Sequence, residues 1–260
     1  MTTSAQTHTA TLGADLAITL DEAGTGRPVL ILHGGGGPAT VAPLAAHLSR
    51  NQHTLVPTHP GWNGTPRPEG ARSIGDIARA YLRYLQLRGL NDVLVVGSSI
   101  GGWIGAEMAL RDADGITTGL VLIDAVGVHV GGESIRDVFA LDAREVARYS
   151  FHDPERFRVA PAAMAAGHEE RQRANMATMN AVAGDPYMHD PMLLQRLPGV
   201  TLPVLVLWGA SDRIVTPAYG RAYADALGNA RFELIAEAGH LPHLEQPDRV
   251  FGLIDAYAKG

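Results

Sequence analysis

The sequence predicts an α/β fold, in which a mostly parallel β-sheet is flanked by helices on both sides and interrupted by a helical insertion. Short runs of consecutive apolar residues alternate with longer segments of helical periodicity along most of the chain. Strands that are apolar at consecutive positions are typical of a parallel sheet covered on both faces. The alternation favours parallel pairing, because each parallel connection needs a crossover. It stops between residues 126 and 198, which indicates an insertion.

The elements of the core follow from these patterns in chain order. We expect residues 10–24 to contribute an antiparallel pair of strands at the start. Runs such as VLILH and PVLVLWG predict further strands at residues 29–33, 53–57, 92–97, 119–124, 203–209 and 231–235. Helical periodicity between them predicts helices at residues 41–48, 74–87, 99–111, 217–227 and 248–258.

The insertion shows helical patterns and no convincing strand. Helices are expected at residues 135–149, 154–157, 160–183 and 191–197. Five of the seven methionines of the chain fall in the insertion: Met164, Met176, Met179, Met188 and Met192. Flexible methionines suit an adaptable apolar pocket, and they equally suit the filling of gaps between small helices.

The composition narrows the classes of function. The 260 residues are 46% hydrophobic and 18% charged, with a net charge of −6, which suits one large domain or a core with an insertion. Without a basic block, nucleic acid is not an expected partner. No stretch approaches the roughly 18 apolar residues of a membrane span, and the start does not resemble a signal peptide. The absence of cysteine excludes disulfides and thiol nucleophiles, and we expect a cytoplasmic protein.

A candidate nucleophile lies where a predicted strand meets a predicted helix. The pattern G-x-S-x-G of a nucleophile elbow fits in one register only, from Gly97 through Ser98, Ser99 and Ile100 to Gly101. Ser99 is therefore the candidate, and Ser98 is not. A strained turn leaves no room for side chains two residues on either side, which explains the glycines. The alternative is a plain tight turn in which a serine caps the helix.

A base and an acid in the expected order support the elbow. Asp212 follows a predicted strand, and His240 lies before the last predicted helix, so both belong at the carboxyl edge of the sheet. His240 would accept the Ser99 proton, and Asp212 would orient the imidazole. Asp124, which also ends a strand, is the rival acid.

Three other histidines are rival bases with other expected roles. His33 is expected to brace the glycine-rich loop and His243 to be structural. His59 either approaches the pocket or packs in the interior.

The glycine-rich stretch LHGGGGP after the strand at residues 29–33 offers backbone amides to a developing oxyanion. We assign Gly35 and Ile100 as the two donors. Gly34, Gly36 and Ala39 also fit a relaxed dinucleotide fingerprint, but no acid follows about 20 residues later. We therefore expect no organic cofactor.

A metal site has weaker support. His240, His243 and Glu245 hint at one, but no third spaced cluster of ligands accompanies them. No metal is expected.

Together, the motifs HGGGG, GSSIGG, WGASDRIV and GHLPHLEQP resemble those of the α/β-hydrolase fold family, in its capped single-domain serine hydrolases. The resemblance covers nearly the whole chain. It implies an eight-stranded core formed by residues 1–125 and 199–260, with a helical cap at residues 126–198 inserted after the sixth strand.

The resemblance implies hydrolysis of a small-molecule substrate, and it leaves the oligomeric state open. We expect a small to medium, mostly apolar ester or lactone, bound in part by Trp62, Met164 and Met179. Carbon–carbon bond hydrolases of the meta-cleavage type typically carry Asn before the nucleophile and Trp after the catalytic histidine, where this chain has Ser98 and Leu241. They stay an alternative, as does a slow-turnover small-ligand receptor on the same fold.

Overall fold

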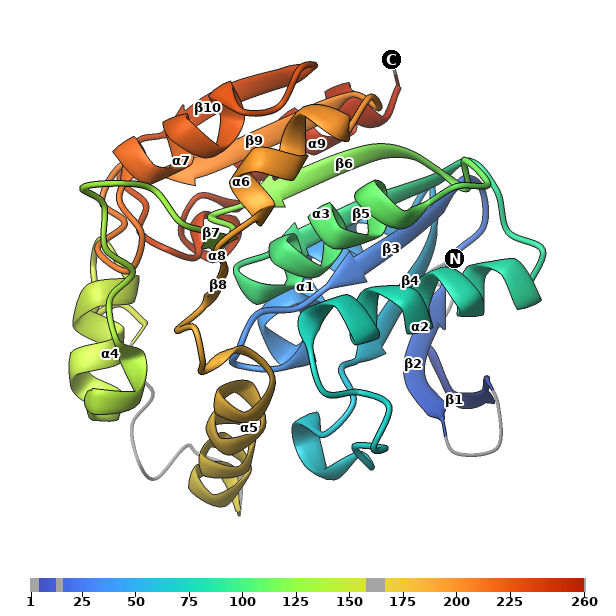
Figure 1. Ribbon diagram of the computed structural model, residues 1–260, viewed down its shortest axis with the longest axis horizontal. Coiled ribbons are helices and arrows are strands. Elements are labelled where there is room, and N and C mark those ends of the chain that lie inside the picture. Colours follow the sequence, from blue (N-terminus) through green and yellow to red (C-terminus); the bar gives the residue numbers. More distant parts are fainter. Residues whose placement is uncertain (1–4, 13–15, 158–166, 260) are drawn as a thin grey trace.

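The computed structural model describes residues 5–12, 16–157 and 167–259. An eight-stranded sheet forms the centre, with the strand order β1-β2-β4-β3-β5-β6-β9-β10 (Figure 1). The pairs β1–β2 and β2–β4 are antiparallel and the others are parallel, which confirms the predicted mostly parallel sheet. The strands are β1 (Gln6–Thr11), β2 (Ala17–Ala23), β3 (Pro28–Leu32), β4 (His53–Thr58), β5 (Val93–Ser98), β6 (Thr117–Ile123), β9 (Val204–Gly209) and β10 (Ala230–Ile235).

Helices cover both faces of the sheet because successive residues of a strand point to opposite sides. Leu30 and Leu32 of β3 join one core cluster, whereas Val29 and Ile31 join the other. The first cluster includes side chains of α2, α3 and α7, and the second includes side chains of α1 and α9. The helices around the sheet are α1 (Ala42–Leu48), α2 (Ile74–Leu87), α3 (Ile100–Arg111), α7 (Pro217–Asp225), α8 (Pro242–Glu245) and α9 (Pro247–Ala258), with short 3-10 turns η1 (Pro38–Val41) and η2 (Trp62–Gly64).

Helix α2 shows how local sequence sets an element. Ser73 and Asp76 form a capping box, in which each side chain accepts a hydrogen bond from the backbone N–H of the other residue. Ile77, Tyr81 and Leu85 recur on the buried side of the helix at intervals of four residues. The helix therefore begins and ends at the predicted residues.

Strand β10 is one edge of the sheet and has an unpaired side. Leu234 is 47% exposed there, but charged side chains flank it. Glu233 pairs with Arg231 on the same strand and with Arg249 on α9. Charged side chains such as these protect an edge strand against pairing with another chain.

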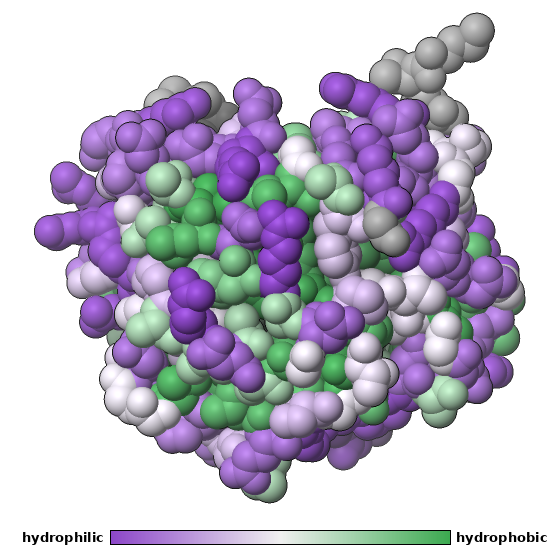
Figure 2. Space-filling view, turned by 90° about the horizontal axis from the view of Figure 1, so that it is seen from above, coloured by the Kyte–Doolittle hydropathy of each residue, from purple (hydrophilic) through white to green (hydrophobic). Residues whose placement is uncertain are grey.

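In the view from above, apolar residues show in the middle of the molecule's face and hydrophilic residues surround them (Figure 2).

The insertion differs from the prediction in two ways. The expectation that it lacks strands is wrong, because β7 (Gly127–Val128) and β8 (His189–Asp190) pair in parallel as a separate two-stranded sheet. Its first predicted helix is also shorter than expected. The helices of the insertion are η3 (Val138–Ala140), α4 (Ala143–Ser150), α5 (His168–Ala183), α6 (Leu193–Arg196) and η5 (Leu197–Gly199).

Helices α4 and α5 lie at the lower left of the view in Figure 1, below α7 and β8. The predicted helix at residues 160–183 begins outside the described residues, and its described part is α5. The predicted helix at residues 154–157 is a turn instead. That residues 126–198 form a separate cap domain stays a prediction. Among the described residues, no helix is long and apolar enough to cross a membrane.

Candidate active site

Ser99 lies at the end of β5, immediately before α3, in a backbone conformation that residues with side chains rarely adopt. Its φ is 54° and its ψ is −117°. The turn is so tight that a Cβ at Gly97 would lie 2.3 Å from the carbonyl oxygen of Gly101. A Cβ at Gly101 would lie 2.2 Å from the carbonyl oxygen of Leu32. Both positions therefore require glycine, and the turn has the geometry expected of a nucleophile elbow.

The structure brings Ser99, His240 and Asp212 together at the carboxyl edge of the sheet. The Nε2 atom of His240 lies 2.9 Å from Ser99 Oγ, and its Nδ1 atom lies 2.8 Å from Asp212 Oδ2. A carboxylate accepts the Nδ1–H, so Nε2 is the nitrogen that can accept the serine proton. The backbone N–H of His240 donates to the Ser150 carbonyl at 2.6 Å, which ties this loop to the end of α4.

Two carboxyl groups meet behind the imidazole. Asp212 Oδ1 accepts hydrogen bonds from the amides of Ile214 (2.8 Å) and Val215 (3.1 Å). Asp124, the rival acid, is fully buried, and its Oδ1 accepts from the Gly209 amide at 2.9 Å. Burial and the neighbouring charge of Asp212 raise the pKa of Asp124 well above its usual value. The imidazole is hydrogen-bonded to Asp212, so the geometry favours Asp212 as the orienting acid.

The glycine-rich loop after β3 lies beside Ser99. A Cβ at Gly34 would lie 3.3 Å from Ser99 Cβ, and a Cβ at Gly35 would lie 2.7 Å from Met179 Sδ. Ile100 is the first residue of α3, so its amide is one of those without an acceptor within the helix. The loop and the helix start therefore flank Ser99 from two sides. The role of Gly35 and Ile100 as oxyanion donors stays a prediction.

His33 and His59 brace this loop as a neutral pair whose rings are in contact and tilted by 30°. Their ring centroids are 3.7 Å apart. His33 Nε2 accepts from the His59 amide, so its Nδ1–H donates to the Gly34 carbonyl at 2.6 Å. His59 Nε2–H donates to the His33 carbonyl, so its Nδ1 accepts from the Tyr81 hydroxyl. Burial lowers the pKa of His59 to about 4, and burial together with the neighbouring His59 lowers the pKa of His33 well below its usual value.

The predicted pocket residues have different outcomes. Trp62 is fully buried, and its indole N–H donates to the Gly35 carbonyl at 3.0 Å. Its side chain therefore supports the glycine-rich loop. Met179 is 4% exposed and contacts the loop at Gly35. Met164 lies outside the described residues. Contact of these side chains with a substrate stays a prediction.

Helix α5 is attached to the loop and to η2 by polar side chains. Asn175, which is fully buried, is the centre of this attachment. The hydrogen bonds are from the Asn63 amide to Asn175 Oδ1 (2.8 Å), from Asn175 Nδ2 to Asn63 Oδ1 (3.0 Å), from the Thr178 hydroxyl to the Gly61 carbonyl (3.0 Å) and from the Gln172 side chain to the Gly36 carbonyl (3.5 Å). The insertion therefore contacts the backbone that would form the oxyanion hole.

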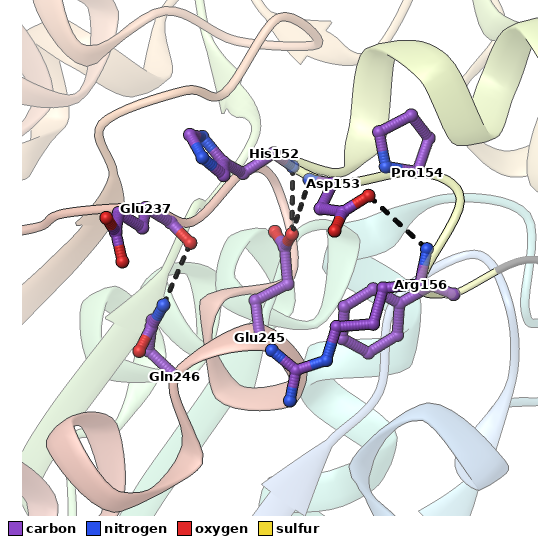
Figure 3. Close-up of a pocket in the computed structure, with 8 residues that line it drawn as sticks. His152, Asp153, Pro154, Arg156, Glu237, Glu245 and Gln246 are labelled. Atoms are coloured by element: carbon purple, nitrogen blue, oxygen red, sulfur yellow. Dashed lines mark hydrogen bonds between the residues drawn. The ribbon is translucent and has the colours of Figure 1, made fainter.

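Sequence reasoning missed a structural role of Glu245. This buried carboxylate accepts hydrogen bonds from the amides of His152 (2.9 Å) and Asp153 (3.2 Å), as Figure 3 shows. It also accepts one from the amide of Gly239 (2.6 Å). Gly239 directly precedes His240, so Glu245 fixes the histidine loop against the insertion. A pocket of about 440 Å³ opens beside it, lined by His152, Asp153, Pro154, Arg156, Phe157, Glu237, Glu245 and Gln246.

The metal alternative that grouped His240, His243 and Glu245 finds no support among the described residues. His243 is buried, its Nε2–H donates to the Thr40 carbonyl at 3.1 Å, and burial lowers its pKa to about 4. Glu245 is occupied by backbone amides. His243 therefore has the structural role that was expected.

Comparison with known proteins now decides the family. The family model described as "Alpha/beta hydrolase family" matches residues 29–253. The chain belongs to the alpha/beta hydrolase family. Among curated relatives, a pimeloyl-[acyl-carrier protein] methyl ester esterase of Aromatoleum aromaticum is 28% identical over 255 residues, covering 90% of this chain and 99% of the relative.

Other similar hydrolases differ in activity. A 2-hydroxymuconate semialdehyde hydrolase of Pseudomonas putida is 24% identical over 271 residues, covering 95% of this chain and 92% of the relative. The solved structure of a thermophilic esterase from Thermogutta terrifontis matches with a TM-score of 0.74 and 24% identity, covering 98% of both chains. The protein is thus an alpha/beta-fold hydrolase, and its relatives do not agree on a substrate.

Proposed function

We propose that this hydrolase cleaves a small to medium, mostly apolar carboxylic ester or lactone through an acyl-enzyme on Ser99. The observation that carries the proposal is the continuous hydrogen-bonded line from Ser99 Oγ through both nitrogens of His240 to Asp212. The strained backbone at Ser99 presents the hydroxyl at the edge of the sheet, where a nucleophile of this family is expected.

The proposed reaction has two halves, formation of the acyl-enzyme and its hydrolysis, and the same groups act in both. Ser99 Oγ attacks the carbonyl carbon while His240 Nε2 takes the hydroxyl proton. The amides of Gly35 and Ile100 stabilise the oxyanion, and Asp212 stabilises the imidazolium. His240 then protonates the leaving alkoxide as the C–O bond breaks. Water attacks the acyl-enzyme by the same route, giving the acid and free Ser99.

The apolar preference is supported by where two arginines of the insertion lie. Arg196 pairs with Glu107 and Asp190, and the guanidinium of Arg136 lies over the Tyr149 ring at 4.6 Å. Both cations therefore already have partners within the protein. A guanidinium aimed at the site would instead select a carboxylate-bearing substrate.

The second candidate is carbon–carbon bond hydrolysis. It is favoured by the similarity to the 2-hydroxymuconate semialdehyde hydrolase over nearly the whole chain. Ser98 and Leu241 stand where those enzymes typically carry Asn and Trp, which favours ester or lactone cleavage instead. A small-ligand receptor with slow turnover is the third candidate.

A screen of chromogenic esters of increasing chain length separates the three candidates. Neutral esters should be hydrolysed with turnover that Ser99→Ala abolishes. Each is compared with a carboxylate-bearing ester of the same length. A tenfold preference for the charged series, about 1.4 kcal/mol in transition-state binding, would favour the carbon–carbon candidate. Binding without turnover would favour the receptor. Because we expect no metal or organic cofactor, activity should survive exhaustive chelation and dialysis.

A further inference from the structure

Asp124 and Asp212 form a buried pair of carboxyl groups that the reaction scheme uses only in part. Asp124 is fully buried and Asp212 is 3% exposed. One side-chain oxygen of each aspartate and a ring nitrogen of His240 all lie within 4.8 Å of one another. Two carboxylates this close and this deeply buried cannot both ionise without a large electrostatic cost.

The hydrogen bonds decide which of the two carries the charge. Asp212 accepts three N–H donors, from His240, Ile214 and Val215. Asp124 accepts only one, from Gly209, and its Oδ2 is buried without a partner among the described residues. Three donors stabilise a carboxylate, whereas an isolated buried oxygen favours the protonated form.

No described cation offsets a second negative charge. Within residues 5–12, 16–157 and 167–259, no arginine or lysine forms an ion pair with Asp124 or Asp212. The ionisable groups near Asp124 are Asp212, Glu245 and His240, and a ring nitrogen of His240 lies within 4.8 Å of a side-chain oxygen of each aspartate. His240 donates its hydrogen bond to Asp212, whereas the negative charges of Asp212 and Glu245 add to the cost of ionising Asp124.

We propose that Asp124 is protonated in the resting protein and donates a hydrogen bond from Oδ2 to the Asp212 carboxylate, so that the pair carries one negative charge. Asp124 is then a positioning residue. It acts on the imidazole only through Asp212, by completing the hydrogen bonds that fix this carboxylate. The part concerning catalysis rests on the proposed triad, whereas the shared proton does not.

An electrostatic role follows from the shared proton. The imidazolium formed in each half-reaction faces one negative charge, held in a fixed orientation, with no second charge beside it. When Asp124 loses its proton as the pH rises, the donor is lost and two carboxylates repel each other behind His240. The rise in the pKa of Asp124 through burial and Asp212 places this event well above the range where carboxyl groups usually titrate.

The activity test uses variants that separate shape, donor and charge. Asp124→Asn keeps the shape and supplies an N–H donor, so kcat should fall less than about tenfold. Asp124→Leu removes the donor, so kcat should fall about a hundredfold with little change in KM. Asp212→Asn removes the charge, so kcat should fall about a thousandfold or more. A decline of kcat with rising pH that comes from loss of the Asp124 proton should be absent in Asp124→Asn. An Asp124→Asn variant as impaired as Asp212→Asn would overturn the proposal.

Difference infrared spectroscopy tests the proton without any substrate. Wild-type protein, first treated with a chelator, should show the carbonyl band of a protonated carboxylic acid at neutral pH. The band should disappear in Asp124→Asn, and in Asp212→Asn it should be lost at a lower pH than in the wild type. No acid band in the wild type would overturn the shared proton. A band accompanied by no Ser99-dependent turnover would leave the proton in place and reject the proposed function instead.

Discussion

Two adjacent serines differ sharply in what they can reach. Ser99 Oγ is within hydrogen-bond distance of His240, whereas Ser98 Oγ is buried without a partner among the described residues. We expect Ser99→Ala to lower kcat about a thousandfold or more, because the groups of a triad act as a unit. Ser98→Ala should lower it less than tenfold. Steady-state kinetics on one neutral ester measures both, and equal losses would reject the assignment of the nucleophile.

The candidate site was predictable where backbone sterics leave a local trace. Gly97 and Gly101 flank Ser99 because no Cβ fits there, and that spacing is visible in the sequence. Asp212 was predicted as the acid in the order Ser, Asp, His along the chain, although Asp124 also follows a strand at the same edge of the sheet, and His240 is hydrogen-bonded to Asp212. The role of Glu245 was hidden, because its partners are backbone amides from two distant segments.

At the scale of elements, α5 joins the insertion to the glycine-rich loop through Asn175. Asn175→Ala would leave the Asn63 amide and side chain without partners, so the free energy of unfolding should fall by about 2 kcal/mol. The loosened loop should also lower kcat. Asn180→Ala, on the exposed side of the same helix, is the matched control and should change stability by less than about 0.5 kcal/mol. Chemical denaturation and ester kinetics check both, and similar effects at the two positions would contradict the attachment.

Elements with local determinants were predictable, and elements held by distant partners were not. Residues 74–87 carry a capping box and a buried face, and they form α2 as expected. The helix expected at residues 135–149 is replaced at its start by irregular chain. There the Arg136 amide donates to the Ile214 carbonyl and the Val138 amide to the Tyr187 hydroxyl. Strands β7 and β8 have two residues each, too few for any periodicity.

For the whole molecule, three buried histidines make stability depend on pH. Burial lowers the pKa of His59 and of His243 from the usual 6.5 to about 4, and that of His33 below its usual range. Below pH 6.5 the unfolded chain binds these protons while the folded protein does not. Their contribution is therefore fully present above pH 6.5 and is lost as pH falls toward 4.

Between pH 7.5 and pH 5 we expect the free energy of unfolding to fall by about 2 kcal/mol per buried histidine. Denaturant titrations at the two pH values measure the change. His243→Gln keeps a donor for the Thr40 carbonyl. This variant should show a smaller fall in the free energy of unfolding, by the amount that one histidine contributes. His129→Gln, at an exposed position, should leave it unchanged. A stability that does not change between these pH values would contradict the prediction.

The conformation at Ser99 also bears on how such a chain evolves. A φ of 54° with a ψ of −117° suits glycine, so the fold taken alone would be better served by a residue that has no hydroxyl. Selection for folding stability alone would therefore replace Ser99, and only selection for turnover keeps serine at this position. A descendant with glycine at this position would keep the fold and be more stable. It could bind a ligand without hydrolysing it.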